Sequence, residues 1–343
     1  MRIPPALSAH IHARSSALKP LVAAWRLGSY RSGALRGLPL AIRNRDDPFR
    51  LGIVVEKDAG GRQTVKLDTA RLRDDRTLFS TLWKRGGVFV DLIADPDTAS
   101  GSYVCDLGDI CAQPGPVLAF CSNNAENSLV PDRTFYLKNG YAADRRLAAA
   151  APSWNERDHT VLWRGGLNGS GSVSGDTMTS DNDRLLQRVR LGLAARDIRG
   201  TDIKIPVGKH FDAGLGEHYR SLRIAGGYVP QSQWTHRKFA VDIDGNSNAF
   251  SNLYTRLLYG CCVLKVASPF GFRQWYYDEL KPWTHYVPVA ADLSDLAERV
   301  RWCRDNDDVC QAIAAAGQRL AHGMTRDSEK RATVARINAA FAG

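Results

Sequence analysis

The chain has 343 residues, of which 44% are hydrophobic and 24% are charged. This balance is typical of a soluble globular protein with two domains of ordinary size, and it excludes a disordered chain. No run of about 18 apolar residues is present, so no membrane-spanning helix is expected. The seven cysteines form no Cys-x-x-Cys pair, which favours reduced thiols in a cytosolic protein over a disulfide framework or a zinc site.

The formal net charge of +10 is unevenly spread, because residues 1–45 contain eight Lys or Arg and no Asp or Glu. Arg26, Arg31 and Arg36 interrupt the apolar residues, so this segment is not expected to be a signal peptide. It is either a solvated basic extension or a segment that binds an anionic membrane surface, at about 1 kcal/mol per basic residue. Nucleic acid is not an expected partner, since no helix-turn-helix, RNA-binding aromatic motif or zinc finger is recognisable.

Between residues 46 and 150, short apolar runs surround one longer amphipathic stretch. The stretch 68–83 has the apolar spacing of a helix. The segment 147–159, which contains Pro152 and several alanines, indicates an interdomain connection. Strands are predicted at 51–56, 102–107, 116–122 and 133–138.

After residue 159 the alternation of strands and helices restarts. Strands are predicted at 160–166, 202–207, 236–244 and 261–268. Helices are predicted at 182–196, 249–260, 272–280, 292–306 and 308–324, and the last two have an Asp near their start, as a helix N-cap favours. Two such series predict parallel α/β layers in two Rossmann-like lobes.

Three segments follow predicted strands and are candidates for a ligand site, because ligands of open α/β sheets bind at the carboxyl ends of strands. Glycines in two of them allow close approach of a phosphate, and a helix N-terminus attracts it. The Gly/Ser-rich run after Trp163 is equally typical of a flexible surface loop, and the absence of Gly-Lys-Ser/Thr excludes a P-loop. The segments are Arg164-Gly165-Gly166, Asp244-Gly245-Asn246-Ser247 and Asp106-Leu107-Gly108-Asp109.

Asp242 and Asp244 leave two interpretations open. Residues i and i+2 of a strand point to the same face, so both carboxylates could bind one divalent cation. Alternatively, Asp244 caps the turn through its side chain while backbone amides approach a phosphate. The position of the pair, between a buried strand and Gly245, favours the capping role.

Four stretches resemble glycosyltransferase family 90, the family of the bacterial LpsA-like enzymes, the fungal capsule xylosyltransferases and the animal protein O-glucosyltransferases. The resemblance covers about residues 100–320 and is most specific in the string LK-x-W-x-HYVPV-x-x-DLSDL at 280–296. The stretches are WRGG (163–166), DIDGNSN with the following serine (242–251), GCCVLKVASPFGFRQWYYDELKPWTHYVPV (260–289) and DLSDLAERVRWCRDNDDVCQAIAAAG (292–317).

The resemblance implies a GT-B fold, an α/β architecture of two facing Rossmann-like lobes with parallel sheets. The expected parts are the basic segment 1–45, an N-terminal acceptor-side lobe (46–150), a C-terminal nucleotide-sugar-binding lobe (151–325) and a C-terminal helix (326–343) on the first lobe. The implied activity is inverting transfer from a UDP-sugar to a hydroxyl of a glycan or lipopolysaccharide-type acceptor. No metal or other cofactor is implied.

By resemblance, the UDP diphosphate lies at the turn 244–247 and at the N-terminus of the helix 249–260. Family members commonly have an arginine shortly after the serine at 251, whereas this chain continues with Asn252. A basic side chain elsewhere is expected to supply the charge, and the His-Tyr pair at 285–286 belongs either to the sugar pocket or to the core. The expected site comprises Arg164, Gly165, Gly166, Asp244, Gly245, Asn246, Ser247, Ser251, Arg256, Lys265, His285 and Tyr286.

Asp109 best matches the catalytic aspartate of the family and is expected to take the proton of the acceptor hydroxyl, with Asp106 as the alternative. A positioned base of this kind accelerates the reaction about 10²–10⁴-fold. A lipid-linked glycan acceptor implies a cytoplasmic protein held at the inner membrane face by residues 1–45. The competing function is a non-catalytic nucleotide-sugar or glycan-binding protein on the same fold, which the missing arginine keeps open.

Overall fold

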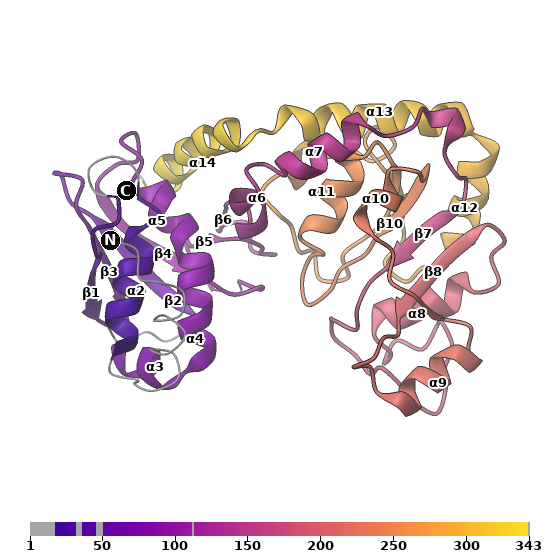
Figure 1. Ribbon diagram of the computed structural model, residues 1–343, viewed down its shortest axis with the longest axis horizontal. Helices are drawn as coiled ribbons and strands as arrows, with labels where there is room; N and C mark the ends of the chain where they lie inside the picture. Colours follow the sequence, from indigo (N-terminus) through magenta and orange to yellow (C-terminus); the bar gives the residue numbers. More distant parts are fainter. Residues whose placement is uncertain (1–17, 32–35, 46–50, 112, 342–343) are drawn as a thin grey trace. The chain divides into compact units, whose positions relative to one another are not determined.

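The computed structural model describes residues 18–31, 36–45, 51–111 and 113–341 (Figure 1). The chain forms two compact units, Met1–Leu137 with Arg326–Gly343 and Lys138–Thr325. Each unit contains one six-stranded sheet, which confirms the α/β class. The division falls after Leu137 and not at residue 150, because α7 (Ala142–Ala149) packs on α11 (Ser251–Leu258) within the second unit.

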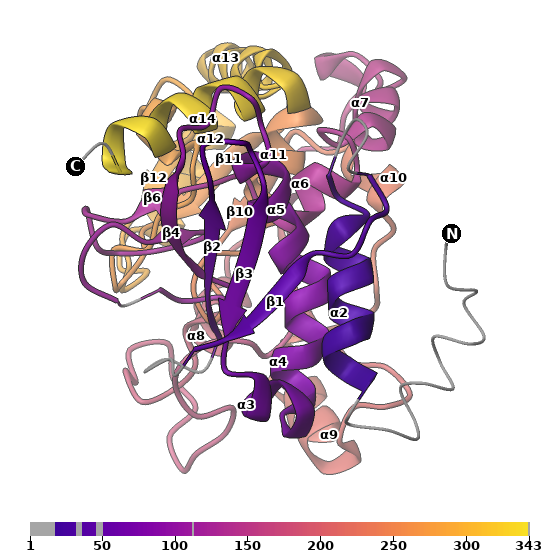
Figure 2. The same cartoon turned by 90° about the vertical axis from the view of Figure 1, so that its left-hand side faces the viewer.

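The sheet of the first unit is mixed, which corrects the expectation of parallel sheets in both lobes. Strand β2 runs antiparallel to both β3 and β4, whereas the other neighbours are parallel. The turn 58–62 between β2 and β3 is too short for the crossover that a parallel pair needs. Figure 2 shows β4, β2, β3 and β1 side by side. The order is β1 (Ala41–Asn44), β3 (Gln63–Leu67), β2 (Gly52–Lys57), β4 (Gly101–Asp106), β5 (Leu118–Ala119) and β6 (Ser128–Leu129).

Part of the basic N-terminal segment belongs to the first unit. Helix α2 (Lys19–Gly28) buries one apolar face, formed by Val22, Ala23, Ala24 and Leu27, and β1 pairs with β3. Residues 1–17 of the segment lie outside the described residues. In the part of the chain that the structure describes, no helix has the length and apolar composition needed to cross a membrane.

Residues 133–137 are helical, which corrects the strand predicted at 133–138. The carboxylate of Asp132 accepts hydrogen bonds from the backbone amides of Thr134 (2.6 Å) and Phe135 (3.2 Å). This N-cap outweighs the β propensity of the aromatic residues. The helical segments of this unit are α3 (Thr69–Asp74), α4 (Arg76–Thr81), a π-helical turn (Leu82–Gly86), α5 (Gly87–Ile93), α6 (Arg133–Leu137) and α14 (Arg326–Phe341), whose Lys330 lies 3.3 Å from the Asp91 carboxylate on α5.

The sheet of the second unit is entirely parallel. Its neighbouring inner strands β10 and β11 are buried along their whole length, as expected for a sheet covered on both faces. The strand order reverses between β7 and β10, and such a switch point is where open α/β sheets bind ligands. The order is β12 (Val287–Val289), β11 (Cys262–Val266), β10 (Phe239–Asp242), β7 (Val161–Arg164), β8 (Thr201–Pro206) and β9 (Ala225–Gly226).

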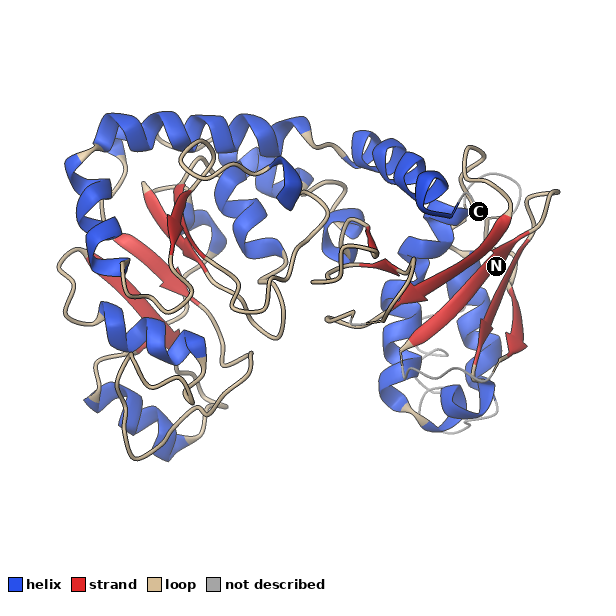
Figure 3. Cartoon of the chain, turned by 180° about the vertical axis from the view of Figure 1, so that it is seen from behind, coloured by secondary structure: helices blue, strands red, loops and turns tan. Residues whose placement is uncertain are grey.

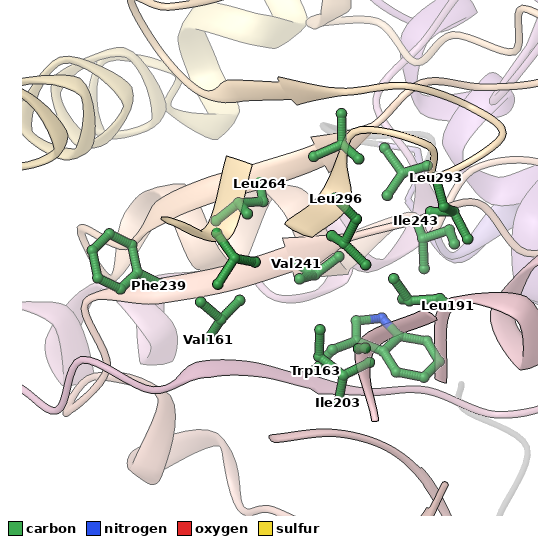
Figure 4. Close-up of a cluster of buried hydrophobic side chains, with 14 of the residues drawn as sticks. Val161, Trp163, Leu191, Ile203, Phe239, Val241, Ile243, Leu264, Leu293 and Leu296 are labelled. Atoms are coloured by element: carbon green, nitrogen blue, oxygen red, sulfur yellow. The ribbon is translucent and has the colours of Figure 1, made fainter. Parts of the chain in front are cut away.

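Helices cover both faces of this sheet (Figure 3). Helices α8 and α12 lie over one face, where Trp163, Val241 and Leu264 form the core seen in Figure 4, and α11 and α13 pack against β11. Each fully buried aliphatic side chain contributes about 1.5–3 kcal/mol. The helical segments not yet given are a 3₁₀ turn (Trp154–Glu156), α8 (Gln187–Ala195), α9 (Ala213–Ser221), α10 (Gln231–Trp234), α12 (Leu296–Asp305) and α13 (Asp307–Gly323).

The segment 272–280 is not the predicted helix and contains only a 3₁₀ turn at Tyr277–Glu279. Trp275 and Tyr276 both pack on Tyr254 of α11, with ring centroids 6.0 and 5.4 Å away. Neighbouring residues of a helix diverge by about 100°, so a helix would not bring both rings to the same partner. Tertiary packing of the aromatic residues therefore sets the local conformation.

Arg145 of α7 binds the C-terminal carbonyl groups of α13. Its guanidinium donates to the backbone oxygens of Ala321 (3.0 Å), His322 (2.9 Å) and Met324 (2.7 Å). These carbonyl groups have no partner within their own helix, so the arginine acts as a C-cap supplied by another element. Burial, and then the charge of Arg145, lower the pKa of His322 below its ordinary value of 6.5.

We expect the free energy of unfolding to fall as the pH drops below 6.5, the ordinary His322 value. The imidazole of His322 binds a proton more weakly in the folded protein than in the unfolded chain. Its contribution to stability is therefore complete above pH 6.5 and is lost as the pH falls through the lower pKa of the folded state. Urea unfolding at several pH values measures it. His322→Gln should make the free energy of unfolding fall less steeply with decreasing pH. The decline that remains should include the part due to His285, whose pKa is also lowered by burial. His218→Gln, at an exposed site, is the control, and an unchanged slope in His322→Gln would contradict the assignment.

Candidate functional site

Two loops meet at the switch point of the second sheet. The loop after β7 and the turn after β10 are joined by a hydrogen bond from the Gly169 amide to Asn246 Oδ1, 3.1 Å long. Arg188 links the same loops, donating to the carbonyl oxygens of Gly166 (3.0 Å) and Asp244 (2.8 Å). A Cβ atom at Gly245 would lie 2.8 Å from Nη2 of Arg188, so a larger residue would displace this guanidinium.

A cavity of about 120 Å³ opens beside these loops. It is bounded by the turn after β10, by the segment that leads into α8 and by the loop after β11. Phe270 presents a largely exposed ring, and its centroid lies 6.1 Å from that of buried Phe272. The lining residues are Gly169, Ser170, Asp183, Leu185, Leu186, Gln187, Arg190, Asp244, Gly245, Ser247, Pro269, Phe270, Phe272 and Ala291.

The carboxyl group of Asp244 lies at the wall of this cavity and also orders the turn. Its Oδ1 accepts a hydrogen bond of 3.2 Å from Nδ2 of Asn248, which in turn donates to the Phe272 carbonyl oxygen. Burial raises the pKa of Asp244, although a hydrogen bond with Ser268 and the charge of Lys265 oppose the shift. The side chain therefore orders the turn and forms part of the cavity wall.

Asp242 has different partners from Asp244. It is fully buried, its Oδ1 accepts a hydrogen bond of 2.8 Å from Asn252, and its Oδ2 lies 3.7 Å from the Lys265 ammonium group. Lys265 faces it across paired strands, since the two residues are in register on β10 and β11. Lys265 also lies 4.6 Å from the ring centroid of Tyr277. These contacts favour a structural ion pair for Asp242 and Lys265.

The N-terminus of α8 lies at the cavity and was not expected there. The predicted helix 182–196 begins only at Gln187, and the preceding residues form the cavity wall. Neither Leu186 at the N-cap nor an acidic first turn neutralises the helix N-terminus. Arg190 adds a positive charge at the wall, held by hydrogen bonds to the backbone oxygens of Ser180 (2.7 Å) and Asp292 (3.2 Å). Anions bind where amides and a guanidinium converge in this way.

Arg164 and Arg256, two arginines expected at the diphosphate, have other partners. Arg164 forms an ion pair of 2.7 Å with Asp202 and donates to the Gly227 carbonyl oxygen at 2.9 Å. Arg256 is buried, with its guanidinium 3.5 Å from the ring centroid of Trp234, and burial lowers its pKa to about 10. Neither side chain lines the cavity. The sequence does not reveal these partners, because the direction of an arginine side chain depends on the neighbouring strand or helix.

The remaining expected residues divide between the two ends of the sheet. Gly165 and Gly166 continue β7 toward the cavity, whereas Ser251 begins α11 outside its lining. His285 and Tyr286 precede β12, at the amino end of a parallel strand and thus at the edge opposite to the cavity. Nδ1 of His285 accepts a hydrogen bond of 3.0 Å from the Lys281 amide, which favours a structural role.

Asp109 and Asp106 belong to the first unit and differ in exposure. The Asp109 side chain is 36% exposed, and its Oδ1 lies 2.5 Å from Nη2 of Arg85. Asp106 is buried and accepts a hydrogen bond of 2.6 Å from the Gly108 amide, and burial raises its pKa. Of the two carboxylates, Asp109 is the one that an external hydroxyl can approach.

Comparisons with known proteins place these features in a family. The chain is 30% identical over 217 residues to an uncharacterised protein of Invertebrate iridescent virus 6, covering 56% of this chain and 17% of the viral protein. It is 40% identical over 87 residues to protein O-glucosyltransferase 3 of Rattus norvegicus, covering 25% of this chain and 16% of that enzyme. The aligned segments thus span less than a quarter of these relatives.

A solved structure, that of HepE from Anabaena in complex with UDP-glucose, aligns with 43% of this chain and 43% of its own chain at 12% identity and a TM-score of 0.33. The profile of glycosyl transferase family 90 matches residues 106–328. This match spans more than half of the chain and includes the whole region around the cavity. The chain belongs to glycosyl transferase family 90.

Proposed function

We propose that this protein transfers a sugar, with inversion, from a UDP-sugar to a hydroxyl of a glycan or lipid-linked glycan acceptor. The observation that carries the proposal is the cavity at the switch point between β7 and β10, in a chain of this family. Nucleotides bind at such points in doubly wound sheets, because several strand ends and helix N-termini converge there.

In this proposal the diphosphate lies between the α8 N-terminus and the turn 245–247. Gly245 allows the backbone to come close, the start of α8 at Gln187 lines the cavity, and Arg190 supplies positive charge. The exposed ring of Phe270 offers a face for the flat uracil base. The Asp244 carboxyl group orders the turn through Asn248 beside the proposed diphosphate position.

Asp109 is the proposed base. It takes the proton of the acceptor hydroxyl while that oxygen attacks the anomeric carbon and the bond to UDP breaks. Arg85 holds the carboxylate in place. Backbone amides and an arginine, rather than a metal ion, stabilise the negative charge that develops on the leaving UDP. The Asp242 carboxylate, which a metal ion would need, already contacts Lys265 and Asn252.

The direct test is the release of UDP from several UDP-sugars in the presence of glycan acceptors. We expect turnover in the presence of a chelator, with no requirement for Mn²⁺. Release that depends on added Mn²⁺ and stops with chelator would restore the metal interpretation of Asp242 and Asp244.

A second function is favoured by one observation. The position after Ser251 is occupied by Asn252, whose amide binds Asp242 and Val241, and not by a cation. A chain without that charge could bind a nucleotide sugar without transferring it. Stabilisation of the protein by UDP, with no turnover on any acceptor, would favour this binding function.

We expect Arg190→Gln to weaken UDP binding roughly 10–100-fold, because one charge-assisted hydrogen bond contributes about 1.5–3 kcal/mol. Titration calorimetry with UDP measures the effect. Arg196→Gln, at the other end of α8, is the matched control and should leave the affinity unchanged. If Arg164→Gln weakens binding and Arg190→Gln does not, the original expectation for Arg164 is correct.

The basic N-terminal segment supports a second proposed contact, with an anionic membrane surface that carries the acceptor. Leu18 and Leu21 of the described part are 41% and 54% exposed and lie beside Lys19. We expect binding to vesicles of anionic lipid that weakens with salt, and a roughly tenfold or greater loss on deleting residues 1–17, which contain Arg2 and Arg14.

Co-sedimentation with anionic and neutral vesicles measures this binding. Leu21→Ser should weaken it, and Val309→Ser, at a similarly exposed aliphatic site on α13, should not. Equal binding of the deletion variant and the full chain would exclude the segment as the membrane contact.

A further inference from the structure

Three cysteines from three different elements meet inside the second unit. Cys262 opens β11, Cys303 lies in the last turns of α12, and Cys310 lies in the first turns of α13. Their Sγ atoms all lie within 4.8 Å of one another, and all three side chains are 0% exposed. Among the His, Cys, Asp and Glu of the described residues, this is the one such group of three that has the spacing of metal ligands.

The cluster is separate from the candidate nucleotide-sugar site. Cys262 pairs in register with Phe239 at the first position of β10, so it lies at the amino edge of the sheet. The cavity lies at the carboxyl edge, beyond Asp242. The proposed transfer reaction therefore makes no use of these thiols, and their function can be tested independently of it.

The geometry is close to that of a metal-thiolate centre. Metal–sulfur bonds of about 2.3 Å place tetrahedral sulfur ligands about 3.8 Å apart. The Sγ–Sγ distances, at most 4.8 Å, would therefore have to shorten by about 1 Å or less. The helix is interrupted at Asn306, between α12 and α13. Cys303 and Cys310 therefore lie on separate helices, whose relative position can adjust to bring the sulfur atoms closer. Burial of the cluster excludes water from a fourth position.

Two contacts hold the start of α13 beside the cluster. The Sγ atom of Cys310 lies 3.6 Å from the backbone oxygen of Cys303, to which its thiol donates. The carboxylate of Asp307, the first residue of α13, lies 2.8 Å from the ammonium group of buried Lys238.

We propose that Cys262, Cys303 and Cys310 form a closed three-thiolate site for a soft metal ion, Cu(I) or Zn(II). Soft sulfur ligands select these ions. Among the described residues the group contains three ligands and no fourth His, Cys, Asp or Glu, which favours Cu(I), because structural zinc almost always takes four ligands. On binding, each thiol releases its proton and the metal joins β11, α12 and α13. The site is structural: it stabilises the second unit and is closed to substrate.

The test is the metal content of the full-length protein after expression with added copper or zinc and purification without chelator. Mass spectrometry of the metals should find one ion per chain, and the copper and zinc cultures distinguish the two ions. Cys310→Ala should lose the ion. Cys261→Ala is the matched control, because Cys261 is adjacent to Cys262 and equally buried but directs its thiol to the carbonyl oxygens of Trp234 and Arg237.

A second measurement does not depend on the variants. The thermal midpoint of the wild-type protein should fall when a thiophilic chelator removes the ion, because an ion that binds only the folded state stabilises it. Wild-type protein without stoichiometric metal from either culture would overturn the proposal. So would a disulfide within the cluster, or equal loss of metal from Cys261→Ala and Cys310→Ala.

Discussion

Asp109→Asn is expected to lower the rate of UDP release by about 10²–10⁴-fold in the presence of acceptor. The amide keeps the shape of the side chain but cannot take the acceptor proton. Affinity for UDP should not change, because Asp109 belongs to the first unit and the cavity to the second. The loss should therefore appear in kcat, measured by a coupled UDP assay under acceptor saturation.

The neighbouring carboxylate provides the comparison for this prediction. The partly exposed ion pair with Arg85 is worth about 0–1 kcal/mol, so Asp109→Asn should fold normally. Asp106→Asn keeps an oxygen for the Gly108 amide but replaces the other carboxylate oxygen by an NH2 group in a buried turn, so it should lower stability more than the rate per folded molecule. Undiminished release by Asp109→Asn would exclude it as the base, and a kcat loss confined to Asp106→Asn would transfer the role to that residue.

Lys265→Met is expected to destabilise the second unit by about 3–5 kcal/mol, since it leaves the buried Asp242 carboxylate without its ion-pair partner. Asp242 is 0% exposed, and the amide of Asn252 that donates to its Oδ1 does not replace the lost positive charge. Urea unfolding followed by tryptophan fluorescence measures the change.

The double variant Asp242→Asn/Lys265→Met separates an ion pair from general packing. Removing both charges should recover most of the lost stability, because no uncompensated buried charge remains. Additive losses in the double variant would contradict the pairing. Full stability of Lys265→Met combined with lost UDP affinity would instead restore the expected diphosphate role of Lys265.

The turn after β10 could be located from the sequence. Its hydrophobic strand, its Asp-Gly step and the following helix are local signals, and they place Asp244, Gly245 and Ser247 at the cavity. The α/β class followed from the alternation of strands and helices for the same reason. The position of the cavity at the switch point required the strand order, which depends on pairing between segments far apart in the chain.

The sequence alone did not show which arginine lines the cavity. Arg164 follows a strand and precedes glycines, yet its guanidinium lies with Asp202 on the neighbouring strand. Arg190 gave no distinctive local signal, because it lies within an ordinary amphipathic helix. Its position at the cavity follows from the late start of α8 at Gln187 and from the packing of that helix beside the turn after β10.

By itself the sequence determined the family, the class of fold and the strand–turn–helix around Asp244, because these depend on patterns within a few neighbouring residues. Only the tertiary structure decided that Lys265 pairs with Asp242, that His285 lies at the far edge of the sheet and that three distant cysteines meet. Such contacts arise from strand register and helix packing, which join residues that no local pattern connects.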